Sequence, residues 1–355
     1  MIRVVEWVDG GVWDAFVQRA PDATIMHLYG WKGVVERAYG HRTFYLAALE
    51  GDELRGVLPL TLVRSRLLGS SLVSMPFMDY GGVCAGGHDK AETALVEAAE
   101  EIAAAQGAVL TLRYLRQPEL QLPYSLEKVT LFLELGTSEE ALWRRLPPER
   151  RNRIRKGQKQ GLTISFHGAE GLHDFYTVFA TNMRDLGSPV HSLSFFREVM
   201  AQLGDRARII LVRYQNQAIG AGLMLLYNGM ISIPWVSSLR RFFDKCPYQV
   251  LYWEAMRFGI AHGYQVLDFG RSSRDSGTFE AKRQWGAEPV QLYWHYYPDG
   301  ADSRVPSTLW RRLLNISHGW PVRGGRLAWA ASFWKHLPVG VTNTVGPWLR
   351  RGIPN

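Results

Sequence analysis

The sequence has little cysteine and no long apolar run. Its two cysteines, Cys84 and Cys246, are too few for a cysteine-rich metal site, and we expect both to be free thiols. The longest apolar segment, residues 218–227, has the length of a strand and contains two glycines, so we expect no transmembrane helix. Glu6 and Asp9 interrupt the apolar character of the first ten residues, which predicts no signal peptide and a reducing, cytoplasmic compartment.

Several catalytic signatures are also missing. The chain contains no G-x-S-x-G nucleophile motif, no His-x4-Asp acyltransferase motif and no H-E-x-x-H zinc motif. Hydrolase and metalloenzyme functions therefore have no support in the sequence. Because no activated nucleophile is recognisable, any transfer chemistry would proceed by direct attack of one substrate on another.

Basic charge is concentrated in two places. The net charge is +8, and the contents of 46% apolar and 21% charged residues are those of a folded globular protein. Residues 144–160 contain eight Lys and Arg against one Glu, and residues 301–355 contain eight against one Asp. Because the rest of the chain is net acidic, these two segments predict anionic partners at particular places.

The pattern of predicted elements occurs twice. The first set consists of a strand, helices, a β-hairpin, a strand, a helix and a strand, at residues 2–8, 11–39, 44–60, 67–73, 90–106 and 108–114. The same order returns in residues 162–269. The hairpin glycines Gly56 and Gly220 lie 164 residues apart. The helix-ending glycines Gly107 and Gly263 lie 156 apart, and this near-constant offset indicates an internal duplication.

Residues 264–297 carry the densest group of candidate functional residues. A β-rich run ends at Phe269 and continues into a polar loop that contains Arg, Ser and Asp. A short helical piece with Phe279, Lys282 and Trp285 follows, and residues 290–297 are predicted as a strand. The loop places polar chemistry at the carboxyl end of a strand, where open sheets commonly have their sites.

This stretch resembles the D-F-G-R-S…F-K-x-x-W-G signature of FemAB-type transferases. The matching residues are 268–272 and 279–286, although Ala281 stands where the family usually has an aromatic residue before the lysine. Similar segments at 78–82, 182–189, 334–338 and 346–347 extend the likeness over nearly the whole chain. It is greatest to the FemAB-like proteins that accompany exosortase (PEP-CTERM) and exopolysaccharide clusters.

The resemblance implies a mixed α/β (α+β) fold of two tandem acetyltransferase-like (GNAT) domains. We expect the first domain at 1–136, a basic helical linker at 137–160, the second domain at 161–297, and a basic, Trp-rich extension at 298–355. The order of elements found in each repeat is also the GNAT order, which supports this expectation independently.

The resemblance also implies an N-acyltransferase with aminoacyl-tRNA or acyl-CoA as co-substrate and without a metal. The enzyme would form an amide on an amine-bearing precursor of peptidoglycan, of another cell-envelope component or of an exopolysaccharide. The alternative is a non-catalytic scaffold that keeps the GNAT fold and binds RNA or a lipid surface. The expected location is the cytoplasm, with a peripheral position at the inner membrane as the second option.

Three residues of the signature are the catalytic candidates. In the family the lysine matching Lys282 lies near the attacked carbonyl, where its ammonium would stabilise the developing oxyanion; a solvated helix lysine is the alternative. Asp268 would accept the amine proton or orient Arg271, or would only cap the turn that follows the strand. Ser272 and Arg274 would join Arg271 in an anion pocket, and an exposed loop is the alternative.

Further candidates for substrate binding lie outside the signature. Asp79 and Tyr80 end a strand of the first repeat, in the region where the family places its acceptor, although turn chemistry also explains them. Trp31 and Lys32 resemble the family's W-x-x-V/K segment, in which the lysine would hold an acceptor phosphate. Arg184 ends a helix, where a cation also suits the helix dipole.

The residues before the predicted helix at 248–262 bear on whether the donor is acyl-CoA or aminoacyl-tRNA. A CoA-binding GNAT domain has a glycine-rich turn there, whose amides hold pyrophosphate at the helix N-terminus. Residues 240–247 contain no glycine, which weakens the case for coenzyme A. Arg240, Arg241 and Lys245 would instead hold phosphate through their side chains, including that of a tRNA end.

Each basic segment has two interpretations. Residues 144–160 would bind nucleic acid or lipid headgroups, or would form a solvated linker helix. The tail would form a membrane-interface or RNA-stacking surface, or would pack against the body of the protein. Its arginines are interleaved with five tryptophans, Trp310, Trp320, Trp329, Trp334 and Trp348.

Overall fold

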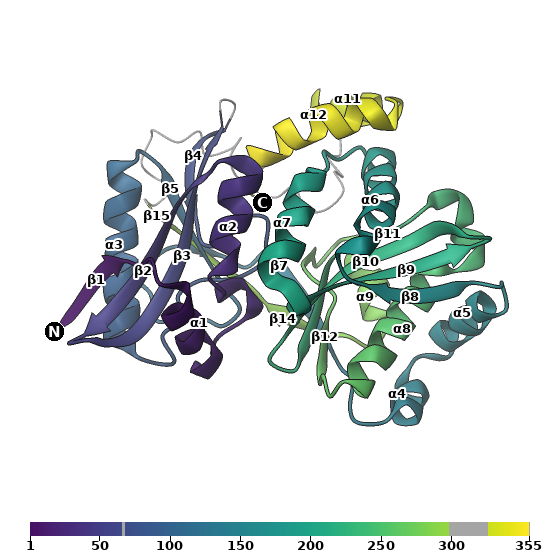
Figure 1. Ribbon diagram of the computed structural model, residues 1–355, viewed down its shortest axis with the longest axis horizontal. Coiled ribbons are helices and arrows are strands. Elements are labelled where there is room, and N and C mark those ends of the chain that lie inside the picture. The colour runs from purple at the N-terminus through teal and green to yellow at the C-terminus, as the bar shows by residue number, and fades with distance from the viewer. Residues whose placement is uncertain (66–67, 298–325, 355) are drawn as a thin grey trace. The chain divides into compact units, whose positions relative to one another are not determined.

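The computed structural model describes residues 1–65, 68–297 and 326–354 (Figure 1). The chain forms two compact units. The first comprises Met1–Lys128, Gln291–Ser317 and Trp348–Asn355, and the second comprises Val129–Val290 and His318–Pro347. Each unit has its own β-sheet with helices, so the expected mixed α/β class is confirmed. None of the described helices is long and apolar enough to cross a membrane.

Among the described residues, the sheet of the first unit has seven strands, of which only β4 and β5 pair in parallel. In spatial order the strands are β1 (Ile2–Glu6), β2 (Arg42–Glu50), β3 (Glu53–Ser65), β4 (Gly69–Val73), β5 (Val109–Tyr114), β15 (Tyr293–Tyr297) and β6 (Tyr124–Ser125). The helices of this unit are α1 (Gly10–Arg19), the 3-10 turn η1 (Ile25–His27), α2 (Gly30–Tyr39) and α3 (Asp89–Ala105).

Both faces of this sheet are covered. Phe44 and Leu46 of β2 belong to the apolar core that includes the buried alanines of α3. Tyr45, which lies between them, packs instead against Trp13 of α1 and Tyr29. Because successive side chains of a strand point to opposite faces, α3 covers one face and α1 with its following loop covers the other.

The described part of the second unit has a sheet of eight strands, with β11 and β12 as a parallel pair. In spatial order the strands are β13 (Ser272–Ser273), β7 (Lys128–Glu134), β12 (Val266–Asp268), β11 (Met230–Ser238), β10 (Gln217–Tyr227), β9 (Ala207–Tyr214) and β8 (Thr163–His167), and β14 (Glu288–Gln291) also pairs with β7. Its helical elements are α4 (Glu139–Arg145), α5 (Pro148–Gln158), η2 (Ala169–Gly171), α6 (Leu172–Leu186), α7 (Leu193–Leu203), η3 (Gly204–Arg206), η4 (Arg240–Lys245), α8 (Pro247–Ala261), α9 (Gly277–Arg283) and α11 (Arg326–Lys335); α12 (Val339–Arg351) begins in this unit.

The two sheets have the same strand order, as the duplication predicts. β1 to β5 in one sheet correspond to β8 to β12 in the other, and each fifth strand is followed by one further antiparallel strand. In the first sheet this further strand is β15, which comes after the second repeat in sequence. In the second sheet it is β7, which comes after the first repeat. The units therefore differ from the expected domain limits, 1–136 and 161–297, at these two strands.

The expected linker at 137–160 belongs to the second unit. Ser138 caps α4 by accepting a hydrogen bond from the Ala141 amide (3.3 Å), and Pro148 is the first residue of α5. Helix α5 is not solvated all round, because Arg150, Ile154 and Gly157 are buried along one side and α5 packs against α8. The basic residues that α5 exposes are Arg153, Arg155, Lys156 and, just after it, Lys159.

Candidate functional site

Strands β11 and β12 separate where the signature begins. They pair over three positions, of which Ser232 opposite Asp268 is the last. Beyond Ser232, β11 continues beside β10 to Ser238, whereas the chain after Asp268 follows β7, with the Phe269 amide donating to the Leu131 carbonyl (3.0 Å). Within the described part of the chain, no strand pairs with this side of β11 after Ser232. The sheet is therefore open between β11 and β12.

A β-bulge lies at the point of separation. Leu223 of β10 is opposite Trp235 and Leu225 is opposite Ser232, so Ile233 and Pro234 lie opposite one residue of β10. Bulges bend the strand that contains the extra residue, and proline is tolerated in a sheet at such positions because it has no N–H to donate. The sequence of β11 itself thus directs the strand away from β12.

Asp268 lies at the closed end of this opening and is buried, with 2% of its surface exposed. Its Oδ1 accepts hydrogen bonds from the Thr130 hydroxyl and the Gly270 amide (2.8 Å). Its Oδ2 accepts one from the Ser232 hydroxyl (3.4 Å). The bond to Gly270 is the turn-capping contact expected from the sequence, and the other two join β12 to β7 and β11.

Lys282 faces the signature loop. Helix α9 is capped by Ser276, whose hydroxyl accepts from the Phe279 amide (3.2 Å). From this helix the half-buried Lys282 ammonium donates to the carbonyls of Gly270 (2.8 Å) and Arg271 (2.9 Å). The structure thus brings Lys282, Asp268 and the backbone of Arg271 together around one loop. The oxyanion role of Lys282 remains a prediction.

The remaining loop candidates differ in exposure. Arg271 is 7% exposed and Ser272, in β13, is 1% exposed, whereas Arg274 is exposed. The Ser272 hydroxyl has no hydrogen-bond partner among the described residues. Arg271 and Ser272 therefore lie inside the unit and only Arg274 is on the surface, so the three do not form one open anion pocket in this conformation.

Three other candidates meet in an open pocket of about 830 Å³ within the second unit. Arg184 comes from α6, and Arg240 and Arg241 come from η4, just after β11. The rest of the lining comes from α6, from the adjoining ends of β9 and β10 with the turn between them, from the residue before η4 and from the start of α12: Asp174, Thr177, Thr181, Asp185, Arg213, Asn216, Gln217, Ala218, Leu239 and Val339. A cavity of this volume accommodates a nucleotide-sized ligand.

The charges of the pocket favour an anion. Arg184 pairs with Asp185 (2.6 Å) and donates to the Leu337 carbonyl (3.2 Å), and Arg213 pairs with Asp174. Both carboxylates are thus neutralised. Arg240 and Arg241 are exposed, and neither forms an ion pair with an acidic side chain of the described residues. The pocket therefore keeps an excess of two positive charges, carried by groups suited to phosphate.

Lys245, the third cation predicted to hold phosphate, does not line this pocket. Its ammonium lies 3.8 Å from Asp244 and 4.3 Å from the centre of the Tyr214 ring. Cys246 follows with a positive φ of 57°, and Pro247 begins α8 without an N–H to offer. The start of α8 thus lacks the amide-rich turn of a CoA site, and the available cations belong to side chains.

The pocket and the signature loop occupy different positions along β11. Asp268 is level with Ser232, whereas η4 starts after Ser238, six residues farther along the strand. At about 3.3 Å per residue this separation is roughly 20 Å. A ligand that reached both places would therefore be long and would run beside the unpaired edge of β11.

The candidates in the first unit make internal contacts. Trp31 is buried and its Nε1 donates to the Ile25 carbonyl (2.8 Å). Lys32 donates to the Thr43 hydroxyl (2.9 Å) and pairs with Glu36 (3.1 Å), and its side chain is 23% exposed. Asp79 and Tyr80 are 9% and 1% exposed, respectively. Their roles in acceptor binding remain predictions.

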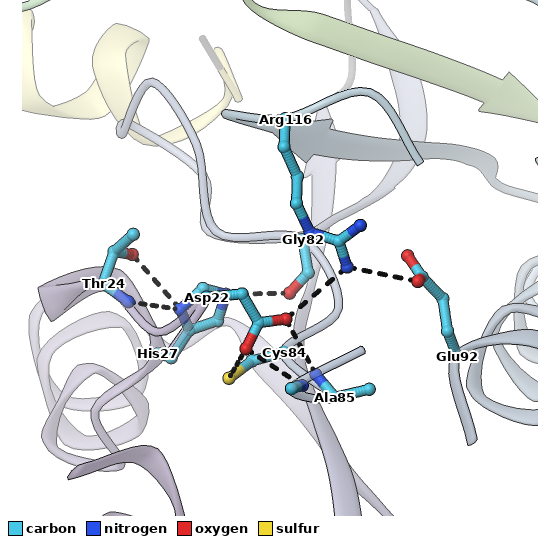
Figure 2. Close-up of polar contacts among 9 residues, drawn as sticks. Asp22, Thr24, His27, Gly82, Cys84, Ala85, Glu92 and Arg116 are labelled. Carbon is cyan, nitrogen blue, oxygen red and sulfur yellow. Dashed lines mark hydrogen bonds and ion pairs between the residues drawn. The ribbon is translucent and has the colours of Figure 1, made fainter. Parts of the chain in front are cut away.

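A partly buried polar cluster around the turn that follows Asp79 and Tyr80 was not predicted. Figure 2 shows the carboxylate of Asp22 between the 84–86 turn and the guanidinium of Arg116. It accepts from the amides of Ala85 (3.1 Å) and Gly86 (3.0 Å) and from the Cys84 thiol (3.4 Å). Arg116 lies 3.5 Å from Asp22 and 3.2 Å from Glu92, so one cation serves two carboxylates. An isolated aspartate in a loop gives no sequence signal for such a role.

His27 holds the preceding part of the same loop. Its Nδ1 accepts from the Thr24 amide (2.9 Å), so the neutral ring carries its proton on Nε2 and donates to the Gly82 carbonyl (3.1 Å). Burial lowers the pKa of His27 to about 4 and raises the pKa of the Cys84 thiol. The ring is therefore neutral and the thiol protonated at pH 7. The cluster fixes the backbone of residues 82–86; among the described residues no group of His, Cys, Asp and Glu is arranged to hold a metal.

Comparison with known proteins identifies the fold. Residues 149–283 match the family model described as the acetyltransferase (GNAT) domain. No curated protein matches the chain in sequence.

Several solved structures resemble this chain over most of its length. FemX has a TM-score of 0.66 at 14% identity, over 82% of this chain and 96% of FemX. The C-terminal domain of a protein assigned as a lysylphosphatidylglycerol synthetase, from Agrobacterium fabrum, has a TM-score of 0.60 at 11% identity, over 87% of this chain and 98% of that domain. A tandem GNAT protein from the clavulanic acid biosynthesis pathway has a TM-score of 0.52 at 13% identity, over 83% of this chain and 98% of that protein. These likenesses confirm the expected fold of two tandem GNAT-like domains.

Proposed function

We propose that the chain is an aminoacyl- or acyltransferase of the GNAT type that forms an amide on an amine-bearing precursor of the cell envelope or of an exopolysaccharide. The observation that supports it most strongly is the opening between β11 and β12, within the segment that matches the GNAT domain. A strand edge without a partner presents backbone N–H and C=O groups, to which an extended donor can bind.

The reaction needs no covalent enzyme intermediate. The amine of the acceptor attacks the carbonyl carbon of the bound ester or thioester, and the carbonyl oxygen becomes an oxyanion. The C–O or C–S bond then breaks, and the departing tRNA hydroxyl or thiol takes a proton while the new amide loses one. Backbone N–H groups of β11 and the Lys282 ammonium are the candidate donors to the oxyanion.

Asp268 fits a supporting role better than that of the base. Its two carboxylate oxygens already accept three hydrogen bonds from Thr130, Gly270 and Ser232. We assign the amine proton to solvent and give Asp268 the task of holding β12, β7 and β11 together at the closed end of the opening. Arg271, whose carbonyl is held by Lys282, would shape the same loop.

The cationic pocket would hold phosphate of a substrate. Arg184, Arg240 and Arg241 meet there, about 20 Å along β11 from the loop, a distance that the end of an aminoacyl-tRNA or an acyl-CoA can span. The absence of a glycine turn before α8 favours aminoacyl-tRNA over acyl-CoA. FemX and the synthetase domain support an aminoacyl or acyl transfer only in that they share the fold of this chain. The proposed location is the cytoplasm, next to the inner membrane.

A donor screen tests this proposal. The purified protein is incubated with aminoacyl-tRNA or with acyl-CoA, and bound species are read by native mass spectrometry. Retained donors are then offered to amine-bearing envelope precursors, and amide products are sought by mass shift. We expect retention of one donor class and formation of an amide. If neither donor is retained, the transferase proposal is wrong; if RNA is retained without turnover, the non-catalytic RNA-binding scaffold takes its place.

The double variant Arg240→Gln/Arg241→Gln tests the pocket. Both side chains are exposed, so the fold should survive. Losing two charge-assisted phosphate contacts, each worth about 1.5–3 kcal/mol, should weaken donor binding by roughly 100-fold or more. Arg197→Gln is the matched control, because Arg197 is an exposed arginine of α7 that does not line the pocket. Equal donor affinity in the double variant and the control would remove the pocket from the proposal.

A further inference from the structure

Helix α12 exposes its apolar residues. Val341, Val345 and Trp348 are 43%, 40% and 57% exposed. Their spacing of four and three residues places them within an arc of about 60° on this one continuous helix. A helix on the surface of a globular protein normally turns such a stripe towards the core.

A different side of α12, about a third of a turn round the helix from this stripe, packs against protein. Its buried residues are Thr342 and Gly346. A methyl group at Gly346 would lie 3.1 Å from the Val190 amide nitrogen and 3.2 Å from the Val190 side chain, so the close contact depends on glycine. The helix is therefore packed against the protein through its small residues, and the exposure of its apolar stripe does not result from an unpacked helix.

Helix α11 precedes α12 in the chain (Figure 1) and also exposes an aromatic side chain. Phe333 is 55% exposed, and Lys335 and His336 beside it are exposed as well. The helix is held by Ala331, whose carbonyl lies against Gly187 at the end of α6. The exposed aromatic ring is thus carried by a packed helix.

The charge of this part of the chain identifies the partner. Residues 326–354 contain Arg326, Lys335, Arg350 and Arg351 and no Asp or Glu. Among the residues whose exposure is described, Lys335 and Arg351 are exposed cations, and two copies of a surface with only positive charges would repel each other, which disfavours a homodimer through this face. A surface that is apolar along one stripe, contains an exposed Trp and carries only basic charges matches the interface of an anionic bilayer.

We propose that α12, with α11, docks this protein on the surface of an anionic membrane. The 13 residues of α12 extend about 20 Å, too short to span the hydrocarbon core, so the helix lies in the plane of the interface with Val341, Val345 and Trp348 among the acyl chains. Lys335 of α11 and Arg351 at the end of α12 are both exposed and would each bind anionic lipid headgroups. This inference does not rest on the transferase activity.

Co-sedimentation of the full chain with lipid vesicles tests the proposal. We expect the protein to bind vesicles that contain phosphatidylglycerol, and to bind pure phosphatidylcholine vesicles at least about tenfold more weakly. Binding to the anionic vesicles should weaken as the salt concentration is raised. The variant Val341→Thr/Val345→Thr/Trp348→Gln keeps α12 and removes its apolar stripe. It should bind the anionic vesicles at least about tenfold less well than the unchanged protein.

Two further variants make the test specific. Val12→Thr/Leu126→Gln removes exposed apolar side chains of the first unit, 46% and 48% exposed, and should leave vesicle binding unchanged. Lys335→Gln/Arg351→Gln should reduce the preference for anionic over neutral lipid, by roughly fivefold for each charge. Equal binding of the stripe variant and the control would overturn the proposal. So would a stripe variant that loses a concentration-dependent dimer and binds vesicles as before, because the occupant would then be a second copy.

The outcome is separable from that of the proposed function. Vesicle binding is measured without donor or acceptor, and donor retention is measured without lipid. If the protein binds vesicles and retains no donor, this inference stands and the transferase proposal is wrong. If it retains a donor and does not bind vesicles, the transferase proposal stands and this inference is wrong.

Discussion

Lys282 is the residue on which the proposed chemistry depends most. Its ammonium lies 2.8 and 2.9 Å from the carbonyls of Gly270 and Arg271. These two hydrogen bonds fix the position of the ammonium and also stabilise the loop. Lys282→Met keeps the length of the side chain and its helix propensity while removing the charge.

If the ammonium stabilises the oxyanion, Lys282→Met should lower kcat by about 10²–10³. If it only fastens the loop, the two carbonyls lose their donor, and the free energy of unfolding should fall by about 1–3 kcal/mol while KM rises. Steady-state kinetics and urea denaturation separate these cases. Arg283→Met, at an exposed position of the same helix, is the control. Full activity with unchanged stability in Lys282→Met would contradict both roles.

His27 predicts a dependence of stability on pH. Burial lowers its pKa from 6.5 to about 4. Between these values the unfolded chain binds more protons at this residue than the folded chain does, so the free energy of unfolding falls as the pH falls through that window. The contribution is about 3 kcal/mol, present above pH 6.5 and lost near pH 4.

Urea denaturation of His27→Gln checks this expectation. Glutamine can accept from the Thr24 amide and donate to the Gly82 carbonyl, and it does not titrate. The decrease in stability from pH 7 to pH 4 should therefore be smaller in this variant by about 3 kcal/mol. His173→Gln, at an exposed site, should retain the full decrease. Equal pH profiles for His27→Gln and the unchanged protein would place His27 in a solvated environment.

At the scale of elements, local signals predicted the structure well. The polar pair Gln215-Asn216 predicts a type I′-like turn, and both residues have positive φ, 47° and 64°. Helix α6 spans Leu172–Leu186, the range that its apolar spacing predicts, and ends at Gly187 with φ 80°. Such elements are determined by residues close in sequence, whose caps and turns need no tertiary partner.

Elements that depend on distant partners were predicted less well. Residues 290–297 were expected to form one strand, but Glu288–Gln291 pairs with β7 while Tyr293–Tyr297 pairs with β5 and β6. Both interpretations of α5, an anion-binding surface and a solvated linker, leave its arginines exposed, yet Arg150 is buried over Trp285 because the flat guanidinium packs on the ring. The periodicity of apolar residues shows which face of a strand or helix is buried. It does not show which sheet or helix covers that face.

The candidate site shows the same division. The signature predicted that Asp268, Arg271 and Lys282 gather around one loop. Nothing local to Arg184 indicated that it would share a pocket with Arg240 and Arg241, some 55 residues later, because that meeting depends on how α6 packs on β10 and β11. The separation of β11 from β12 likewise becomes apparent only when the register around Pro234 is known.

At the scale of the whole molecule, the exchange of β7 and β15 makes each unit depend on a strand from beyond its own repeat. β15 follows the second repeat and pairs with β5 of the first unit, and β7 follows the first repeat and pairs with β12 of the second. Neither the fragment 1–136 nor the fragment 161–297 contains a complete sheet. The stability of each repeat is therefore coupled to sequence that adjoins the other.

Single proline substitutions test this coupling in the intact chain. Tyr296→Pro removes the amide that donates to the Pro123 carbonyl (2.9 Å) and disturbs the ladder of β15. Because proline removes this bond and its ring disturbs β15 between its two neighbours, hydrogen exchange should become faster at β6 and at β5 in the first unit, while β9 to β11 keep their protection. Leu133→Pro, in β7, should have the reciprocal effect, with faster exchange at β12 and unchanged exchange at β2 and β3. Mass spectrometry of peptic peptides resolves these strands. Faster exchange at β12 after Tyr296→Pro, with β5 unaffected, would mean that β15 stabilises the repeat it follows in sequence and that the strand exchange is wrong.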